Sequence, residues 1–247
     1  MASGLLDRLL RFVVPKPDAS FLPPPRAIAP GAWVIERRVF LAGARLPSCS
    51  TVVAIGAGRL AILSPPADVT PDVERLGTLA AIVAPNSFHY LHAPAWHRRY
   101  PAAALYVAPE LPRRVPGLPL VAELTPDASP PWREVLPFVV LGPDRGISEV
   151  VFFHRASRTL VLTDVASNLV DVDRAADRLA YRVSGMPRGF GPTRNSRRLL
   201  LRDQPRVRET LRAVMQWPFE RIVVAHGAVV ERRAADVFVS AFAKYVT

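Results

Sequence analysis

The stretch "LAAIVAPNSFHYLHAPAW", residues 79–96, contains a buried-strand pattern followed directly by two histidines. The run LAAIVAP is apolar throughout, which is typical of a strand covered on both faces. His89 and His92 come after the strand ends, and APAW then begins a short helical pattern. This order predicts an α/β fold with polar chemistry at the carboxyl end of a strand.

Apolar and β-branched runs surround this stretch on both sides. Residues 32–63 contain three such runs separated by Gly and Pro, which predicts an antiparallel meander. A short helix is expected at 68–77, with Thr70 as its cap and Pro71 in its first turn. Strands and helices then alternate, so the chain is predicted to cover a mixed sheet with helices.

The expected helix over 167–185 follows the strand that ends in "TLVLTD". Ser167 or Asn168 is predicted to cap it, and Gly185 lies just beyond its end. Residues 186–195, "MPRGFGPTRN", are predicted to form a loop. Two more helices are expected around the last strand, "RIVVAHG".

The N-terminal part differs in composition from the rest. Residues 1–30 are predicted to contain a short helix at 4–13 and an extended, proline-rich strap without regular structure. Residues 31–247 show no fixed repeat and no compositional break, so a single domain is expected there. Association with a membrane surface through the first segment is a weaker prediction, since its leucines can share one helical face beside arginines. These residues are Leu5, Leu6, Leu9 and Leu10, with Arg8 and Arg11.

Composition limits the class of protein. The chain has 247 residues, of which 50% are hydrophobic, which is enough for a sizeable core. No apolar run approaches the roughly 20 residues needed to cross a bilayer, and no convincing cleavage site follows the N-terminus. A cytoplasmic location is therefore expected. The single cysteine, Cys49, excludes an internal disulfide and is expected to be a structural thiol.

The formal net charge of +11 is concentrated in one region. Between residues 174 and 212, eleven arginines face three acidic residues. They are Arg174, Arg178, Arg182, Arg188, Arg194, Arg197, Arg198, Arg202, Arg206, Arg208 and Arg212, against Asp177, Asp203 and Glu209. This region is either a solvated helical surface or a face that binds an anionic partner. Binding to nucleic acid is not favoured. Aromatic and basic residues do not alternate along the chain, and the sequence contains no zinc finger or helix-turn-helix motif.

Three predicted strands end at residues that can bind a metal or transfer a proton. "LAAIVAP" leads to His89 and His92, "TLVLTD" ends at Asp164, and "RIVVAHG" ends at His226. If these strands are parallel neighbours, their carboxyl ends form one rim and the side chains converge. Neutral histidine and ionised aspartate are ligands for zinc, iron or manganese. Each residue alone could equally be a cap or a loop anchor.

These segments resemble the metallo-β-lactamase fold, a four-layer αββα sandwich found mostly in metal-dependent hydrolases. The stretches "IVAPNSFHYLHAPAWHRRYPAAALYVAP", "EVVFFHRASRTLVLTDVASNL" and "WPFERIVVAHGAVVE" look more closely like an uncharacterised family with a degenerate version of that fold. The resemblance spans roughly residues 30–245. It implies an α/β, four-layer sandwich for this chain.

The family's loop pattern, HxHxDH, falls on residues 87–92 only in part. His89 and His92 match its second and third histidines, while Ser87 and Leu91 replace the first histidine and the aspartate. A mid-chain histidine of the family is also missing, and Arg145 is the residue nearest to its place. The bridging aspartate and the last histidine are matched by Asp164 and His226.

The resemblance therefore implies one surviving metal position at most. His92, Asp164 and His226 would hold one ion, and His89 would be a fourth ligand, a supporting residue or the general base. The first interpretation is a mononuclear metal-dependent hydrolase acting on an ester, phosphoester, thioester or lactone, with zinc, iron or manganese. The alternative is a non-catalytic protein, without a required ion, that binds an anionic partner through the arginine-rich region.

Overall fold

The computed structural model describes residues 15–41, 44–118, 122–142, 146–170, 172–202 and 204–247. The helix expected at 4–13 and its membrane-facing leucines lie outside this range, as do Arg145 and Asp203. Within it, one large sheet, one smaller sheet and a two-stranded ribbon account for the strands.

The first sheet has eight strands and mixed pairing, in the order β1-β3-β4-β5-β6-β7-β8, with β2 also paired to β3. Its strands are β1 (Lys16–Pro17), β2 (Arg26–Ala29), β3 (Ala32–Leu41), β4 (Ala44–Ala54), β5 (Arg59–Leu63), β6 (Thr78–Ala84), β7 (Ala104–Val107) and β8 (Ala122–Glu123). The strands from β3 to β5 form the predicted antiparallel meander, and those from β5 to β8 are parallel.

The second sheet has four strands in the order β14-β11-β10-β9, and β12 pairs with β13 to form the ribbon. The strands are β9 (Phe138–Leu141), β10 (Glu149–His154), β11 (Thr159–Val161), β12 (Ser167–Leu169), β13 (Gly189–Gly191) and β14 (Arg221–Val223). The two strands that lead to Asp164 and His226, β11 and β14, are parallel neighbours.

The described helices are short and connect or cover the sheets. They are η1 (Pro71–Arg75), α2 (Ala93–Arg99), α3 (Leu111–Arg114), α4 (Ala175–Ser184), α5 (Arg194–Leu199), α6 (Gln204–Met215), α7 (Ala234–Phe242) and η2 (Ala243–Tyr245). Thr70 caps η1 through its hydroxyl, as predicted, and Gly185 ends α4 in the left-handed conformation.

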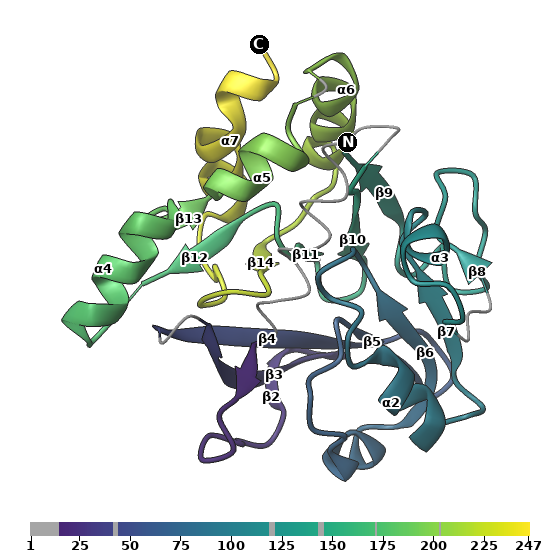
Figure 1. The fold of residues 1–247 in the computed structure, drawn as a ribbon. Helices are drawn as coiled ribbons and strands as arrows, with labels where there is room; N and C mark the ends of the chain where they lie inside the picture. Colours follow the sequence, from purple (N-terminus) through teal and green to yellow (C-terminus); the bar gives the residue numbers. More distant parts are fainter. Residues whose placement is uncertain (1–14, 42–43, 119–121, 143–145, 171, 203) are drawn as a thin grey trace.

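The molecule has four layers: helices, the first sheet, the second sheet and helices again. One hydrophobic cluster lies on each face of the second sheet. Along β10, Val150 and Phe152 pack with the first sheet, while Val151 and Phe153 pack with residues of α6 and α7. Because both faces are covered, "EVVFFH" is buried at every position. Trp96 of α2 is fully buried in the cluster of the first sheet. Helices thus lie outside both sheets, and the predicted four-layer arrangement is confirmed (Figure 1).

Three predictions for local structure were wrong in part. The proline-rich strap contains β1 and β2, which pair with β3, so residues 16–29 contribute to the first sheet. The helix predicted over 167–185 begins only at Ala175, because Ser167–Leu169 is extended and pairs with Gly189–Gly191. The predicted loop at 186–195 supplies that second strand and the start of α5.

Cys49 is buried in β4, and burial raises the pKa of its thiol to about 12. This is the environment of an unreactive, structural thiol. Among the described helices, none is both long enough and apolar enough to cross a membrane.

Candidate metal centre

The loop after β6 directs His89 into the protein because Asn86 folds the backbone back on itself. The side-chain oxygen of Asn86 accepts the backbone N–H groups of Phe88 and His89, at 2.8 and 2.9 Å. Asn86 is completely buried, and its amide nitrogen donates to Thr163 and Asp164, both at 2.9 Å. One side chain therefore fixes the histidine loop and ties it to the aspartate.

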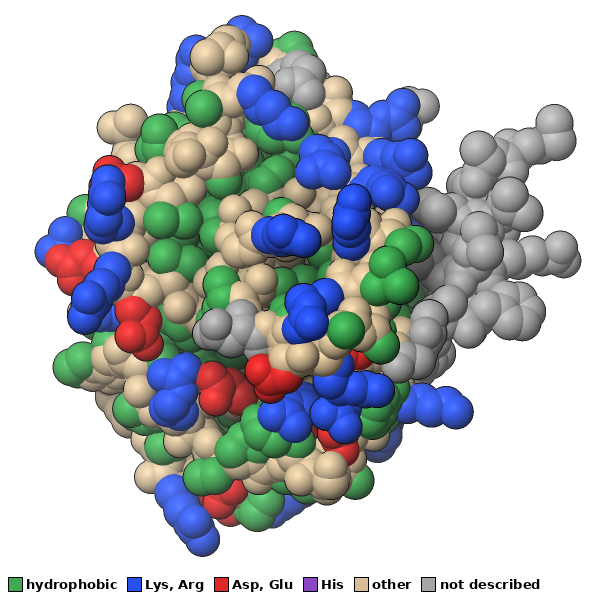
Figure 2. Space-filling view, turned by 90° about the vertical axis from the view of Figure 1, so that its left-hand side faces the viewer, with side chains coloured by type: hydrophobic (Ala, Val, Ile, Leu, Met, Phe, Trp, Pro, Cys, Tyr) green, Lys and Arg blue, Asp and Glu red, His purple; other side chains and the backbone are tan. Residues whose placement is uncertain are grey.

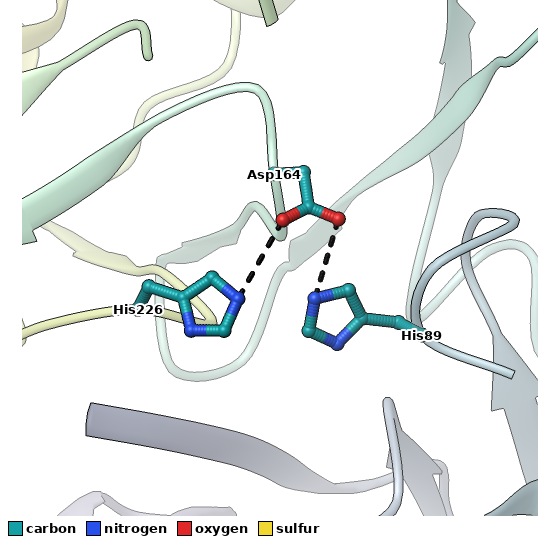
Figure 3. A group of neighbouring side chains, drawn as sticks. All are labelled: His89, Asp164 and His226. Carbon is teal, nitrogen blue, oxygen red and sulfur yellow. Dashed lines mark ion pairs between the residues drawn. The ribbon is translucent and has the colours of Figure 1, made fainter. Parts of the chain in front are cut away.

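Asp164 lies in a tight turn after β11, and this turn is held by Glu149 at the start of β10. The Glu149 carboxylate accepts the backbone N–H groups of Thr163, Asp164 and Val165, at 2.7 to 2.9 Å. Glu149 has no exposed surface, and its burial raises the pKa to about 7 in spite of these donors. The backbone of residues 163–165 consequently has one orientation, which points the Asp164 carboxylate towards the histidines (Figure 3).

His226 follows β14 and is placed by a close contact between two backbone segments. Gly227 has a φ of +128°, and a Cβ there would lie 2.0 Å from the Asn168 carbonyl oxygen. Asn168 also donates its N–H to the His226 carbonyl at 3.0 Å. Only glycine fits after this histidine, which explains the "HG" pair in the sequence.

The three side chains converge in one cluster, which we call the His-Asp-His centre: His89, Asp164 and His226. One ligand atom from each lies within 4.8 Å of the other two. The Nε2 atom of His89 is 3.2 Å from Asp164 Oδ2, and the Nε2 atom of His226 is 3.6 Å from Asp164 Oδ1 (Figure 3). Ligands of a tetrahedral zinc ion stand about 3.3 Å apart when the bonds are about 2.0 Å. The spacing and the donor types therefore fit a metal ion.

The other ring nitrogen of each histidine is held by the first sheet. Nδ1 of His226 is 2.9 Å from the Pro47 carbonyl oxygen in β4. Because a carbonyl can only accept, Nδ1 carries the proton and Nε2 keeps its lone pair in the neutral ring. Nδ1 of His89 is 2.6 Å from the Ser64 hydroxyl, which can accept in the same way. Outer partners of this kind are usual for metal-binding histidines.

The charges of the centre are strongly coupled. Burial acts to raise the pKa of Asp164, but His89, followed by His226 and Asn86, lowers it to about 2. For His89, burial opposes protonation, and the Asp164 carboxylate outweighs it and raises the pKa. Burial dominates at His226 and lowers its pKa. The centre thus presents an ionised carboxylate, which is the form that binds a cation.

His92 does not belong to this cluster, although the sequence favoured it over His89 as a ligand. It lies at the start of α2, where its carbonyl oxygen accepts the N–H of Trp96 at 3.2 Å. Burial, with His89 nearby, lowers its pKa. The structure therefore brings together Asp164, His226 and His89, and leaves His92 beside them.

Ser87 and Leu91, which stand where the resemblance implies further metal ligands, lie in other surroundings. Ser87 donates its hydroxyl to Glu110 at 2.9 Å, and Glu110 also accepts from the backbone and hydroxyl of Ser148. Leu91 is 40% exposed.

His154, outside the centre, is fully buried between Ser157 and the Ala54 carbonyl. It is a structural histidine at the end of β10.

The three side chains do not converge from three neighbouring parallel strands of one sheet, as the sequence predicted. The strands before Asp164 and His226 are neighbours in the second sheet, but β6 belongs to the first sheet. The end of β6 reaches the second sheet through the Val150 N–H, which donates to the Pro85 carbonyl at 2.9 Å. The centre therefore lies where the two sheets meet. Asn86, Glu149 and Ser64 were not predicted, because nothing in the local sequence distinguishes them from ordinary turn and strand residues.

We expect the loss of the Ser64 hydroxyl to lower metal affinity about 10- to 100-fold, since this hydroxyl orients the His89 ring. Ser64 has a φ of +55°, so Ser64→Ala keeps a strained backbone and Ser64→Gly relieves it. Titration with a competing chelator should show similar affinity losses in both variants, whereas thermal unfolding should separate them, with the glycine variant the more stable. Unchanged affinity in both would exclude a role for the hydroxyl.

Comparison with solved structures shows which known fold the chain shares. The DIM-1 metallo-β-lactamase exposed to ceftazidime matches with a TM-score of 0.63 and 13% identity, over 91% of this chain and 99% of that chain. The FIM-1 metallo-β-lactamase of Pseudomonas aeruginosa in its mono-zinc form matches with a TM-score of 0.61 and 14% identity, over 91% and 97%. The metal-soaked Flv1 flavodiiron core of Synechocystis matches with 0.62 and 14%, over 94% and 61%.

The fold and the His-Asp-His centre define a metallo-β-lactamase-fold protein, as the sequence predicted. Residues 31–183 match the family described as a domain of unknown function, DUF4336. The chain belongs to this family. The match includes His89 and Asp164 and ends before His226. No curated protein matches the chain by sequence.

Proposed function

We propose that the His-Asp-His centre holds one metal ion, zinc in the first instance and iron or manganese as alternatives, and that the protein is a mononuclear hydrolase. The observation that carries this proposal is the convergence of two histidine Nε2 atoms on one carboxylate. The Pro47 and Ser64 oxygens support it, because they hold the opposite ring nitrogens. The mono-zinc form of FIM-1 gives a precedent for a single zinc ion on this fold.

In this proposal, the two loop histidines exchange the roles expected from the sequence. Nε2 of His89 faces Asp164 and its Nδ1 faces Ser64, so no ring nitrogen remains for general base catalysis. We assign proton transfer to His92, which lies near His89 and whose pKa is lowered by burial. Leu91 stands in the place of the family's carboxylate and cannot accept a proton.

A bound ion would acidify a coordinated water so that hydroxide is available near neutral pH. The chain's own part is to fix the donors before the substrate arrives. Asp164 supplies the negative charge, His226 and His89 supply ring nitrogen atoms, and Glu149 and Asn86 hold the backbone around them. The substrate class proposed is a small or anionic ester, phosphoester, thioester or lactone.

Metal content and turnover test the proposal together. The untagged protein should contain close to one zinc, iron or manganese ion per chain, and His226→Ala should contain almost none. His92→Ala should keep the ion and lose turnover on a panel of phosphodiesters, esters, thioesters and lactones. A wild-type metal content far below one per chain, unaltered by His226→Ala, would contradict the metal centre. Full metal content with no turnover on the panel would leave a metal-binding protein and contradict the hydrolase.

A further inference from the structure

Helix α4 leaves large apolar side chains exposed to solvent beside arginines, while Tyr181 on its inner side packs with Leu46 and Leu169. Its buried residues are Asp177 and Tyr181. Asp177 accepts the backbone N–H of Arg45 at 3.2 Å, and the Tyr181 hydroxyl donates to the Arg45 carbonyl. The helix is thus attached to β4 through these hydrogen bonds and the packing of Tyr181, while Leu179 and Val183 lie outside the hydrophobic clusters of the described residues.

The outward face of α4 carries the two most exposed large hydrophobic side chains of the described chain. Leu179 is 63% exposed and Val183 is 65% exposed. They are four residues apart, so they lie on one face, and Ala175 extends the same row by one turn. Val170, 45% exposed, precedes the helix. Single exposed hydrophobic residues are common, but a row of them on one helix face that packs against no other described residue is not explained by core packing.

Exposed arginines are frequent in α4 and in the segment that follows it, with almost no opposing charge. Seven exposed arginines fall between residues 172 and 199, against one exposed carboxylate, Asp173. Arg178 and Arg182 lie on α4 itself, next to the row in helical projection. Figure 2 shows this side of the molecule, where blue side chains outnumber red ones over the upper half. The face therefore combines aliphatic side chains with a surplus of positive charge.

We infer that the α4 face, defined by Leu179, Val183, Arg178 and Arg182, docks on an anionic lipid surface. Leucine and valine can enter the acyl boundary while arginines remain with the headgroups. Nucleic acid would satisfy the arginines but offers no environment for exposed aliphatic side chains, since stacking requires aromatic ones. The inference is independent of the metal centre.

Vesicle binding of the full chain tests this inference. Vesicles in which about a third of the lipid is phosphatidylglycerol should bind the protein at least tenfold more tightly than vesicles of phosphatidylcholine alone. Leu179→Ser with Val183→Ser should weaken binding to the anionic vesicles about tenfold or more. A matched control is Val239→Ser, since Val239 is 47% exposed on α7, and it should bind as the wild type does.

The contribution of charge is tested at the two arginines of the same face. Arg178→Gln with Arg182→Gln should weaken binding about fivefold for each arginine, whereas Arg178→Lys with Arg182→Lys should retain most of it. Thermal unfolding verifies that the variants fold, which matters because Arg178 donates to the Val172 and Asp173 carbonyls. His226→Ala should bind vesicles normally and lose only its metal.

Three outcomes would overturn the inference. One is equal binding to neutral and anionic vesicles, or none to either. Another is unchanged binding of the Leu179 and Val183 variant, which would reduce the effect to non-specific charge. The third is binding to DNA or polyglutamate that depends on Leu179 and Val183, which would assign the face to a macromolecular partner.

Discussion

Asp164→Asn is expected to reduce metal affinity by at least about a hundredfold, since changes even to outer partners of a ligand cost 10- to 100-fold. The amide keeps the volume of the carboxylate but loses its charge. It would also turn an N–H₂ group towards one of the two histidine Nε2 atoms, which lie 3.2 and 3.6 Å from the carboxylate oxygens. Elemental analysis after dialysis and competition with a chelator measure the loss.

Asp236→Asn is the matched control for this prediction. Asp236 is an exposed carboxylate that pairs with Arg233 at 3.0 Å, whereas Asp164 is partly buried between two histidines. This variant should retain the metal content of the wild type. If Asp164→Asn retained it as well, the centre would have to bind its ion without the carboxylate, and the proposed ligand set would be wrong.

Glu149→Ala is expected to lower the free energy of unfolding by about 3–5 kcal/mol, the largest stability effect of any single side chain discussed. The substitution leaves the N–H groups of Thr163, Asp164 and Val165 without their acceptor in a fully buried place. Each unsatisfied buried donor costs about 1–3 kcal/mol. Against a total stability of roughly 5–15 kcal/mol, such a loss is severe.

Denaturant unfolding followed by circular dichroism measures this effect. Glu149→Gln should be milder, because one amide oxygen still accepts, but its N–H₂ group opposes the remaining donors. Glu220→Ala is the control, since its exposed ion pair with Arg158 should contribute less than about 1 kcal/mol. If Glu149→Ala lowered the free energy of unfolding no more than Glu220→Ala does, water would replace the carboxylate and the turn would not depend on Glu149.

The fold was largely predictable because several of its strands are apolar runs and its turns carry clear signals. "EVVFFH" is buried at every position and "LAAIVAP" at nearly every one, and both patterns are typical of strands covered on two faces. Thr70 and Gly185 mark helix ends by local chemistry. The ribbon of β12 and β13 was missed because three-residue strands have no readable period, and their pairing joins residues about twenty positions apart.

The sequence predicted which strand ends form the candidate site. It did not predict which of the two loop histidines points into that site. His89 and His92 are both histidines in one loop, and the spacing alone cannot tell which ring turns inward. Asn86 decides this by accepting the Phe88 and His89 N–H groups. Glu149 could not be singled out either, since a glutamate at the start of a strand is normally solvated. Its burial follows only from how the 163–165 turn wraps around it.

Both histidine rings are held by oxygen atoms of the polypeptide itself. This bears on whether the chain needs a bound ion in order to fold. The Pro47 carbonyl and the Ser64 hydroxyl hold these rings through contacts made entirely within the polypeptide. If the centre binds an ion as proposed, we expect the chain to fold without it, unlike a zinc finger, where the ion is required for the folded state. The fraction of chains that hold an ion would then depend on the supply of metal and not on folding.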